Sequence, residues 1–66
     1  MQPAKNPSPD ELVALISSSE HKAAKWIEDL ATGDKYYWPA DGSFHYQIAA
    51  AAGVEKYDKG IVTLGD

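Results

Sequence analysis

Aromatic residues crowd into one short part of this sequence, and this crowding constrains how the chain can fold. Five of the seven aromatic residues lie within eleven positions: Tyr36, Tyr37, Trp38, Phe44 and Tyr46. A chain of 66 residues buries only about 60% of the surface that it exposes when unfolded. Large rings are needed for its core, but the interior is too small to hide all of them. We therefore expect some rings to form the core and the others to lie on a contact surface.

Charge and composition exclude several classes of protein. Six lysines stand against ten acidic residues, the net charge is −4, and arginine is absent. Because arginine makes most forked contacts with phosphates and base edges, we expect no sequence-specific binding of nucleic acid. Without cysteine the chain forms neither a disulfide nor a cysteine metal site. His21 and His45 lack a metal-binding spacing, so we expect no metal and no cofactor.

Nothing in the sequence predicts a membrane segment or an export signal. The longest apolar run covers residues 48–52, whereas a spanning helix needs about 20 residues. The first seven residues lack the apolar stretch of a secretory signal. We therefore expect a cytoplasmic protein that does not contact a membrane.

A flexible tail followed by a helix is predicted at the start of the chain. Residues 1–7 contain two prolines and little that is apolar, which is typical of a flexible N-terminal tail. Ser8 can cap a helix, Pro9 suits the first helical position, and Glu11 stands three residues after Ser8. This capping box predicts a helix over residues 9–18.

Residues 19–31 fit two different secondary structures. Helical spacing continues through four apolar residues: Ala23, Trp26, Ile27 and Leu30. Alternatively, residues 25–28 and 35–38 form the two strands of a hairpin. Gly33 would then close the loop in the left-handed conformation with a bulge. The periodicity alone does not decide between a strand and a helix.

The aromatic residues separate into two groups if the hairpin forms. Alternation along a strand places Tyr36 and Trp38 on one face of the sheet and Tyr37 on the other. Trp26 would pair across the ladder with Tyr36 or Trp38. One of the two groups must belong to the core, and the other is available for binding.

The rest of the sequence completes a small mixed fold. Residues 44–52 predict a helix that ends at Gly53, and residues 60–64 predict a final strand after a polar connection over residues 56–59. The order of elements is α-β-β-α-β. We therefore predict the α+β class, with a three-stranded antiparallel sheet covered by two helices in one domain of residues 8–66.

The segment from Asp29 to Gly53 combines an acidic turn with Thr-Gly, an aromatic strand and a helix. The residues that define the pattern are Asp29, Thr32, Gly33, Tyr37, Trp38, Ala40, His45, Ala49 and Gly53, followed by Gly60-Ile61-Val62. This pattern resembles one found in small phage and prophage proteins and in domains of large phage polyvalent proteins. The resemblance covers about half of the chain. It implies a phage origin and favours the hairpin for residues 25–38, but it implies no activity.

Exposed rings and loop acids are the candidate binding residues. The set comprises Trp26, Asp29, Asp34, Tyr37, Trp38, His45 and Tyr46. Tyrosine and tryptophan are enriched at binding hot spots, and carboxylates can dock onto a basic partner. The sequence therefore favours a small phage-encoded interaction module that binds and modulates a host protein. Self-association as a homodimer would also help a chain whose core is small.

Two other functions are compatible with the sequence. In a small-ligand protein, aromatic rings would stack on a nucleotide base while Lys25 or Lys35 meets its phosphate, although the lack of arginine weakens this hypothesis. In an enzyme, His45 would act as the base. It would need an orienting partner and a nucleophile, and its neighbour Ser43 does not share its helix face. We therefore expect no enzymatic activity.

Overall fold

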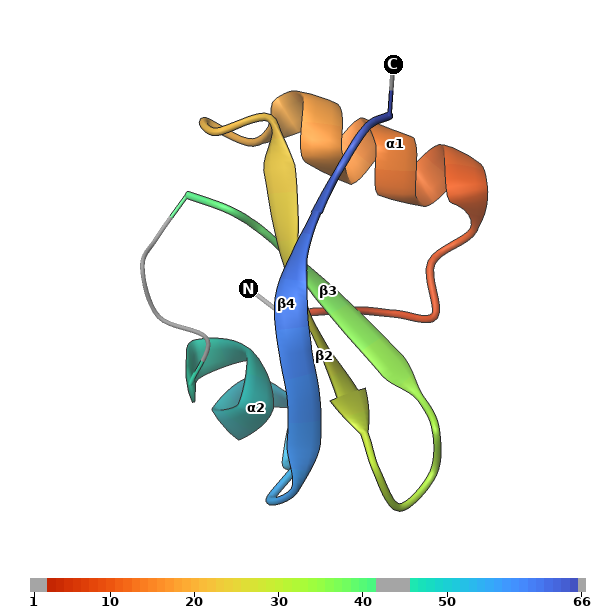
Figure 1. Cartoon of the computed structure of the whole chain (residues 1–66), viewed down its shortest axis with the longest axis vertical. Coiled ribbons are helices and arrows are strands. Elements are labelled where there is room, and N and C mark those ends of the chain that lie inside the picture. The colour runs from red at the N-terminus through yellow and green to blue at the C-terminus, as the bar shows by residue number, and fades with distance from the viewer. Residues whose placement is uncertain (1–2, 42–45, 66) are drawn as a thin grey trace.

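The computed structural model describes residues 3–41 and 46–65, and for Tyr46 the backbone alone. This part of the chain forms two helices and a four-stranded antiparallel sheet (Figure 1). The elements are β1 (Ala4–Lys5), α1 (Pro9–Ser18), β2 (Ala23–Asp29), β3 (Lys35–Pro39), α2 (Tyr46–Ala52) and β4 (Tyr57–Thr63). The strand order is β1-β3-β2-β4. The α+β class is therefore confirmed, whereas the prediction of three strands is wrong.

The additional strand is β1, which lies where the sequence predicts a flexible tail. Ala4 pairs with Tyr37, and Lys5 pairs with Tyr36. The Asn6 N–H donates to the Lys35 carbonyl at 2.7 Å, and the Lys35 N–H donates to Asn6 Oδ1 at 2.9 Å. These contacts make residues 4–6 part of the sheet, so the predicted tail does not extend to them.

Helix α1 has the bounds that the sequence predicts. Ser8 Oγ accepts a hydrogen bond from the Glu11 N–H at 3.2 Å, and Glu11 Oε1 accepts one from the Ser8 N–H at 3.4 Å. This reciprocal pair is a capping box, and it satisfies backbone donors that the first turn of a helix leaves free. The helix contacts β2 and β3 and buries Ile16 against the sheet.

Strands β2 and β3 form the hairpin, which decides the structure of the ambiguous segment. Gly33 has φ +78°, as expected for a left-handed residue that closes such a loop. Its N–H donates to the Asp29 carbonyl at 2.7 Å, while the Asp29 N–H donates to the Asp34 carbonyl at 2.8 Å. Trp26 pairs with Tyr37 and not, as expected, with Tyr36 or Trp38.

The last two elements differ from the prediction mainly at their bounds. The first two residues of the predicted helix lie outside the described residues, and α2 ends before Gly53, which has φ +71°. The Val54 N–H donates to the Ala49 carbonyl at 3.0 Å, which completes a Schellman motif. Residues 57–59, expected in a polar connection, belong to β4 because they continue the pairing with β2.

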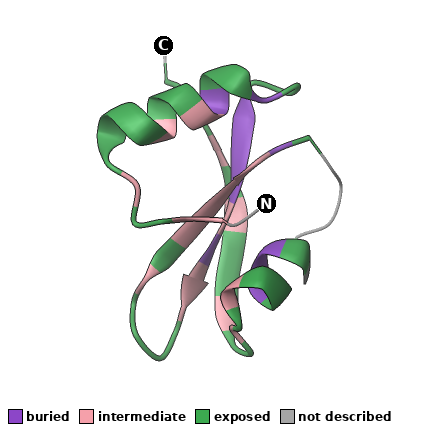
Figure 2. Ribbon diagram, turned by 180° about the vertical axis from the view of Figure 1, so that it is seen from behind, coloured by how far each residue is buried: buried purple, intermediate pink, exposed green. Residues whose placement is uncertain are grey.

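The pairing registers place the side chains on two faces of the sheet. One face carries the residues that pack against α2: Ile27, Tyr36, Trp38 and Tyr57. Ile27 and Ile48 are fully buried and form the centre of this core with Ala49. Ala24, which is on the opposite face, is also fully buried. Helix α1 crosses one end of the sheet and contacts β2 and β3, and Figure 2 shows that burial is greatest in the first half of β2.

Candidate binding surface

Trp26 and Tyr37 lie side by side on the sheet face opposite α2. They are directly paired residues of β2 and β3, so their Cβ atoms are about 5 Å apart. Both side chains are half-buried. In Figure 1, α1 crosses the upper end of the sheet, and no helix of the described chain covers the lower part of this face. We call the surface formed by Trp26, Tyr37 and Gly60 the open sheet face.

Gly60 provides the space that the Trp26 ring occupies. Gly60 pairs with Trp26 on β4. A Cβ atom at Gly60 would lie 2.9 Å from Nε1, 3.0 Å from Cε2 and 3.1 Å from Cζ2 of the Trp26 indole. These distances are shorter than van der Waals contacts, so the indole lies directly over the backbone of Gly60. The ring therefore extends from β2 across β4 and widens the aromatic surface.

Charged side chains border the open sheet face near the hairpin loop. Glu28, Lys35 and Asp58 share its side of the sheet, two positions along the strands from Trp26, Tyr37 and Gly60. Lys35 Nζ lies 3.9 Å from Glu28 Oε1. Since both side chains are partly exposed, this ion pair adds little stability. With two carboxylates and one ammonium group, the border of the face is acidic.

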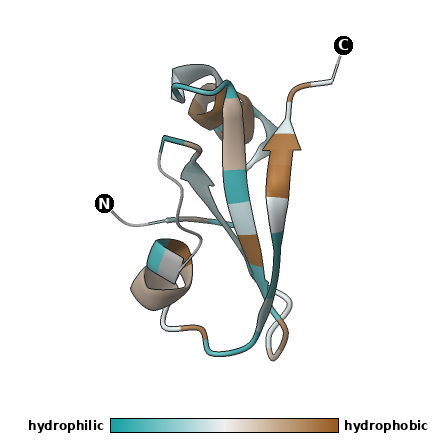
Figure 3. Ribbon diagram, turned by 60° about the vertical axis from the view of Figure 1, so that its left-hand side comes forward, coloured by the Kyte–Doolittle hydropathy of each residue, from teal (hydrophilic) through white to brown (hydrophobic). Residues whose placement is uncertain are grey.

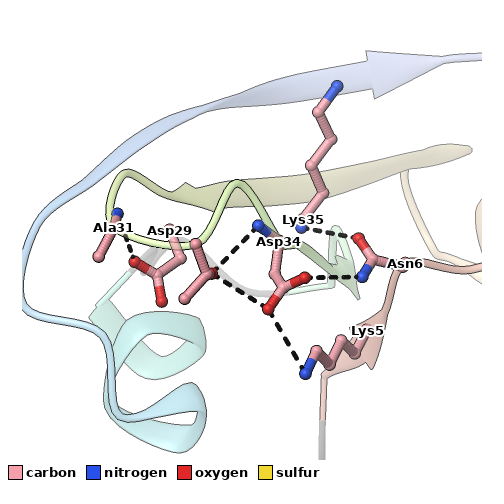
Figure 4. Close-up of polar contacts among 7 residues, drawn as sticks. Lys5, Asn6, Asp29, Ala31, Asp34 and Lys35 are labelled. Atoms are coloured by element: carbon pink, nitrogen blue, oxygen red, sulfur yellow. Dashed lines mark hydrogen bonds and ion pairs between the residues drawn. The ribbon is translucent and has the colours of Figure 1, made fainter.

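The two acids predicted to contact a partner, Asp29 and Asp34, make hydrogen bonds that hold the hairpin loop together. Asp29 Oδ1 accepts a hydrogen bond at 2.9 Å from a backbone N–H of the loop. The Asp34 carboxylate accepts hydrogen bonds from Asn6 Nδ2 at 3.0 Å and Thr32 Oγ1 at 3.1 Å, and Lys5 Nζ lies 3.4 Å from it (Figure 4). Asp34 thereby links β1 to the loop, and both carboxylates are engaged within the chain.

These contacts lower the pKa of Asp34 from its ordinary value of 3.8. The hydrogen bond from Asn6 is the largest cause, followed by the hydrogen bond from Thr32, and the charge of Lys5 adds to both. Partial burial acts in the opposite direction. The folded chain therefore favours the ionised form of this carboxyl group.

We expect the attachment of β1 to the hairpin loop to weaken in acid. A group whose pKa is depressed by folding contributes stability above its unfolded pKa, and this contribution is lost as the pH falls through the folded pKa. The melting temperature should therefore drop below about pH 4. In a series of thermal melts, Asp34→Asn should lack this part of the drop, whereas Glu55→Gln, at an exposed position, should keep it. An unchanged drop in Asp34→Asn would show that Asp34 does not stabilise the fold.

Trp38 belongs to the predicted set of binding residues but lies on the other face of the sheet from Tyr37, as alternation along the strand predicts. It packs against the core around Ile27 and α2, so it is separate from the open sheet face. His45 lies outside the described residues, and so does the side chain of Tyr46. Of the predicted binding rings, the structure therefore brings together Trp26 and Tyr37.

Gly60 is the member of the open sheet face that sequence reasoning missed. The available signal was a glycine inside a β-branched strand, which often marks the close approach of another group. Assigning that group to Trp26 required the pairing of β2 with β4. The sequence offered no means of deriving this register.

A hollow of about 460 Å³ lies between the hairpin loop and the α2–β4 connection. Its lining residues are Asp29, Leu30, Ala31, Gly53, Val54, Glu55 and Lys56. The Leu30 N–H donates to the Lys56 carbonyl at 3.2 Å, so the two segments are joined at this point. The volume is suitable for a small ligand. However, none of the lining residues carries an aromatic ring that could stack on a base.

The two lysines of the nucleotide hypothesis lie in different environments. Lys25 is buried, with 6% of its surface exposed, on the α2 face beside Trp38. It is therefore on the opposite side of the sheet from Trp26. Lys35 borders the open sheet face but lies next to Glu28. Of these two lysines, only Lys35 could accompany the half-buried rings of Trp26 and Tyr37 in binding a phosphate.

The described residues show neither a metal site nor a membrane helix. No group of three or more His, Cys, Asp or Glu side chains within residues 3–41 and 46–65 is placed to hold a metal ion. Over the same residues, no helix has the length and hydropathy needed to cross a membrane.

Comparison with known proteins gives no relative for this chain. No protein family, curated protein or solved structure matches it. The resemblance to phage proteins therefore stays a prediction from the sequence.

Proposed function

We propose that this chain is a small protein-binding module and that its partner binds to the open sheet face. The observation that carries the proposal is the Trp26–Tyr37 pair, two directly paired aromatic residues that stay partly exposed on the sheet face opposite α2. Tyrosine and tryptophan dominate the binding energy of many interfaces. Apolar surface surrounded by charged groups is also typical of interaction sites.

The charges suggest the chemistry of the partner. Glu28 and Asp58 border the open sheet face, and the chain has a net charge of −4. An acidic border favours a partner with basic side chains around an apolar centre. The resemblance to phage proteins makes a protein of a bacterial host the expected partner, with a cytoplasmic location to match.

A nucleotide-binding protein is the second candidate. The observation in its favour is that Lys35 lies two residues from Tyr37 on the same face, so a base on the ring could direct a phosphate towards Lys35. Glu28 pairs with Lys35, and Asp58 pairs with Glu28 on the same face, so these two carboxylates would repel a phosphate. Protein binding is therefore the better supported function. We do not propose catalysis.

Replacing Tyr37 should weaken capture of the partner without unfolding the chain. Threonine suits a strand but removes the ring, and loss of a hot-spot ring reduces affinity about tenfold or more. The immobilised chain, Tyr37→Thr and a control would each be incubated with a bacterial lysate, and the bound proteins quantified by mass spectrometry. Val13→Ala is a suitable control because it trims an exposed apolar residue on α1.

The expected result is a protein recovered by the parent chain and by Val13→Ala but strongly depleted with Tyr37→Thr. Circular dichroism would establish that both variants remain folded. If Tyr37→Thr captured every protein that the parent chain captures, the open sheet face would not be the binding surface. Saturable heat with a purified nucleotide, and no captured protein, would favour the second candidate.

A further inference from the structure

Strand β4 is a long edge of the sheet with no strand on its outer side among the described residues. It pairs with β2 along all seven of its residues. The opposite edge, β1, has only two residues. Because an edge strand presents unpaired N–H and C=O groups, β4 can serve as a template for another strand.

The hydrogen bonds of β2 show which residues of β4 direct their backbone outward. Asp29 directs both its N–H and its carbonyl towards β3 and the loop. Backbone direction alternates along an antiparallel strand, so the even-numbered residues of β2 bond to β4. The bond from the Leu30 N–H to the Lys56 carbonyl agrees with this alternation. The β4 residues that pair with these residues of β2 are also even-numbered, so they direct their backbone groups towards β2. The odd-numbered residues of β4, Ile61 and Thr63 among them, therefore direct their backbone groups outward.

The same edge carries exposed apolar side chains. Ile61 is 60% exposed and Leu64, just beyond the strand, is 46% exposed. Figure 3 shows hydrophobic residues at the C-terminal end of β4. Ile61 has the greatest exposure among the large apolar residues described. Within residues 3–41 and 46–65, outward-facing backbone groups and exposed apolar surface therefore coincide at Ile61.

We propose that two copies of the chain pair antiparallel through β4, with Ile61 at the twofold axis. In such an isologous contact, β4 of one copy pairs with β4 of the other copy. The residue at the twofold axis then lies opposite the same residue of the second copy. The two Ile61 side chains would lie on one face of a sheet that continues through both copies. A β-branched pair in direct opposition stabilises an antiparallel ladder.

Charge and side-chain size favour this register over those centred on Lys59 and Gly60. Centring on Lys59 would place two ammonium groups opposite each other, and centring on Gly60 would leave the axis without side chains. With Ile61 at the axis, the two Lys59 positions are about 13 Å apart along the strands. A second copy therefore fits this edge without opposing like charges.

This self-association uses a different surface from the open sheet face and goes beyond the proposed function. The contact consists of one strand pair and a few side chains, which is smaller than a standard interface. We therefore expect a weak dimer with a Kd between about 10 μM and 1 mM.

Sedimentation equilibrium of the full chain from about 10 μM to about 1 mM tests the proposal. The parent chain should change from monomer to dimer over this range. Ile61→Lys should abolish the change because it places like charges at the axis. Val13→Lys, which alters an apolar residue of 45% exposure on α1, should retain it. A parent chain that stays monomeric throughout, or equal loss in both variants, would overturn the proposal.

A proline variant separates edge pairing from apolar contact. Because the Ile61 N–H points outward, Ile61→Pro removes a hydrogen bond to the second copy and leaves the ladder with β2 intact. It should weaken dimerisation at least tenfold while the amide spectrum remains folded, and a folded Ile61→Pro that dimerises normally would overturn the proposal. Tyr37→Thr should dimerise normally, so that failure of partner binding and failure of self-association can be distinguished.

Discussion

Replacing Ile27 with alanine should lower the free energy of unfolding by about 3 kcal/mol, the largest effect expected in this chain. Ile27 has no exposed surface and packs against Ile48 and Ala49 at the centre of the α2 core. A chain of 66 residues has a total stability of roughly 3 to 10 kcal/mol. Loss of this one side chain would therefore bring the fold close to unfolding, as chemical denaturation would show.

The same substitution at Ile61 is the matched control. Ile61 lies on the same face of the same sheet, but it is 60% exposed. Ile61→Ala should therefore change the stability by no more than about 0.5 kcal/mol, measured at a concentration where the chain is monomeric. Equal losses at both positions would mean that Ile27 is not at the centre of the core.

A side chain at Gly60 should destabilise the fold by displacing Trp26. The new Cβ in Gly60→Ala would stand 2.9 Å from Nε1 of the indole, and a rigid ring cannot move aside without losing its own contacts. Crowding of this kind costs typically 1–3 kcal/mol, partly offset by about 0.5 kcal/mol because alanine suits a strand better than glycine. We expect a net loss of about 1–2 kcal/mol in denaturant titrations.

Removing the Trp26 ring should reverse the sign of the stability change that Gly60→Ala causes. In a Trp26→Ala background the added methyl group meets no ring, so Gly60→Ala should be neutral or stabilise by about 0.5 kcal/mol. Gly65→Ala, where nothing lies within 4 Å of the new Cβ, should be neutral in either background. If Gly60→Ala were equally harmful with and without Trp26, the indole would not lie over Gly60.

Local signals in the sequence were sufficient to predict α1. Ser8, Pro9 and Glu11 specify its start through bonds that span three residues, so no distant contact was required. Residues 23–29 lacked such a signal because their apolar residues suit both a helix and a strand. The pairing of β2 with strands on both sides determined the outcome.

Contacts between distant residues explain the elements that the sequence missed. Strand β1 has two residues and no periodicity, and it is held through Asn6 to Lys35 and Asp34, far along the chain. Strand β4 likewise begins before the predicted residue 60 because residues 57–59 pair with β2. Patterns within a segment do not reveal either contact.

One part of the candidate site could be predicted, because it follows from the alternation of side chains along a strand. Strand geometry correctly separated Tyr37 from Tyr36 and Trp38, and the structure adds that Trp26 joins Tyr37. The roles of Asp29 and Asp34 could not be predicted because they depend on the conformation of the loop and on β1. A carboxylate in a sequence does not show whether it is already engaged.

Chemical-shift mapping tests the role of Trp26 and Tyr37 in binding most directly. The protein captured from lysate would be added to the ¹⁵N-labelled chain and the amide spectrum followed. The proposed binding mode predicts the largest shifts at the Trp26 indole N–H and at the amides of Tyr37 and Gly60. Shifts confined to α2 and residues 53–56, with the Trp26 indole unchanged, would contradict it.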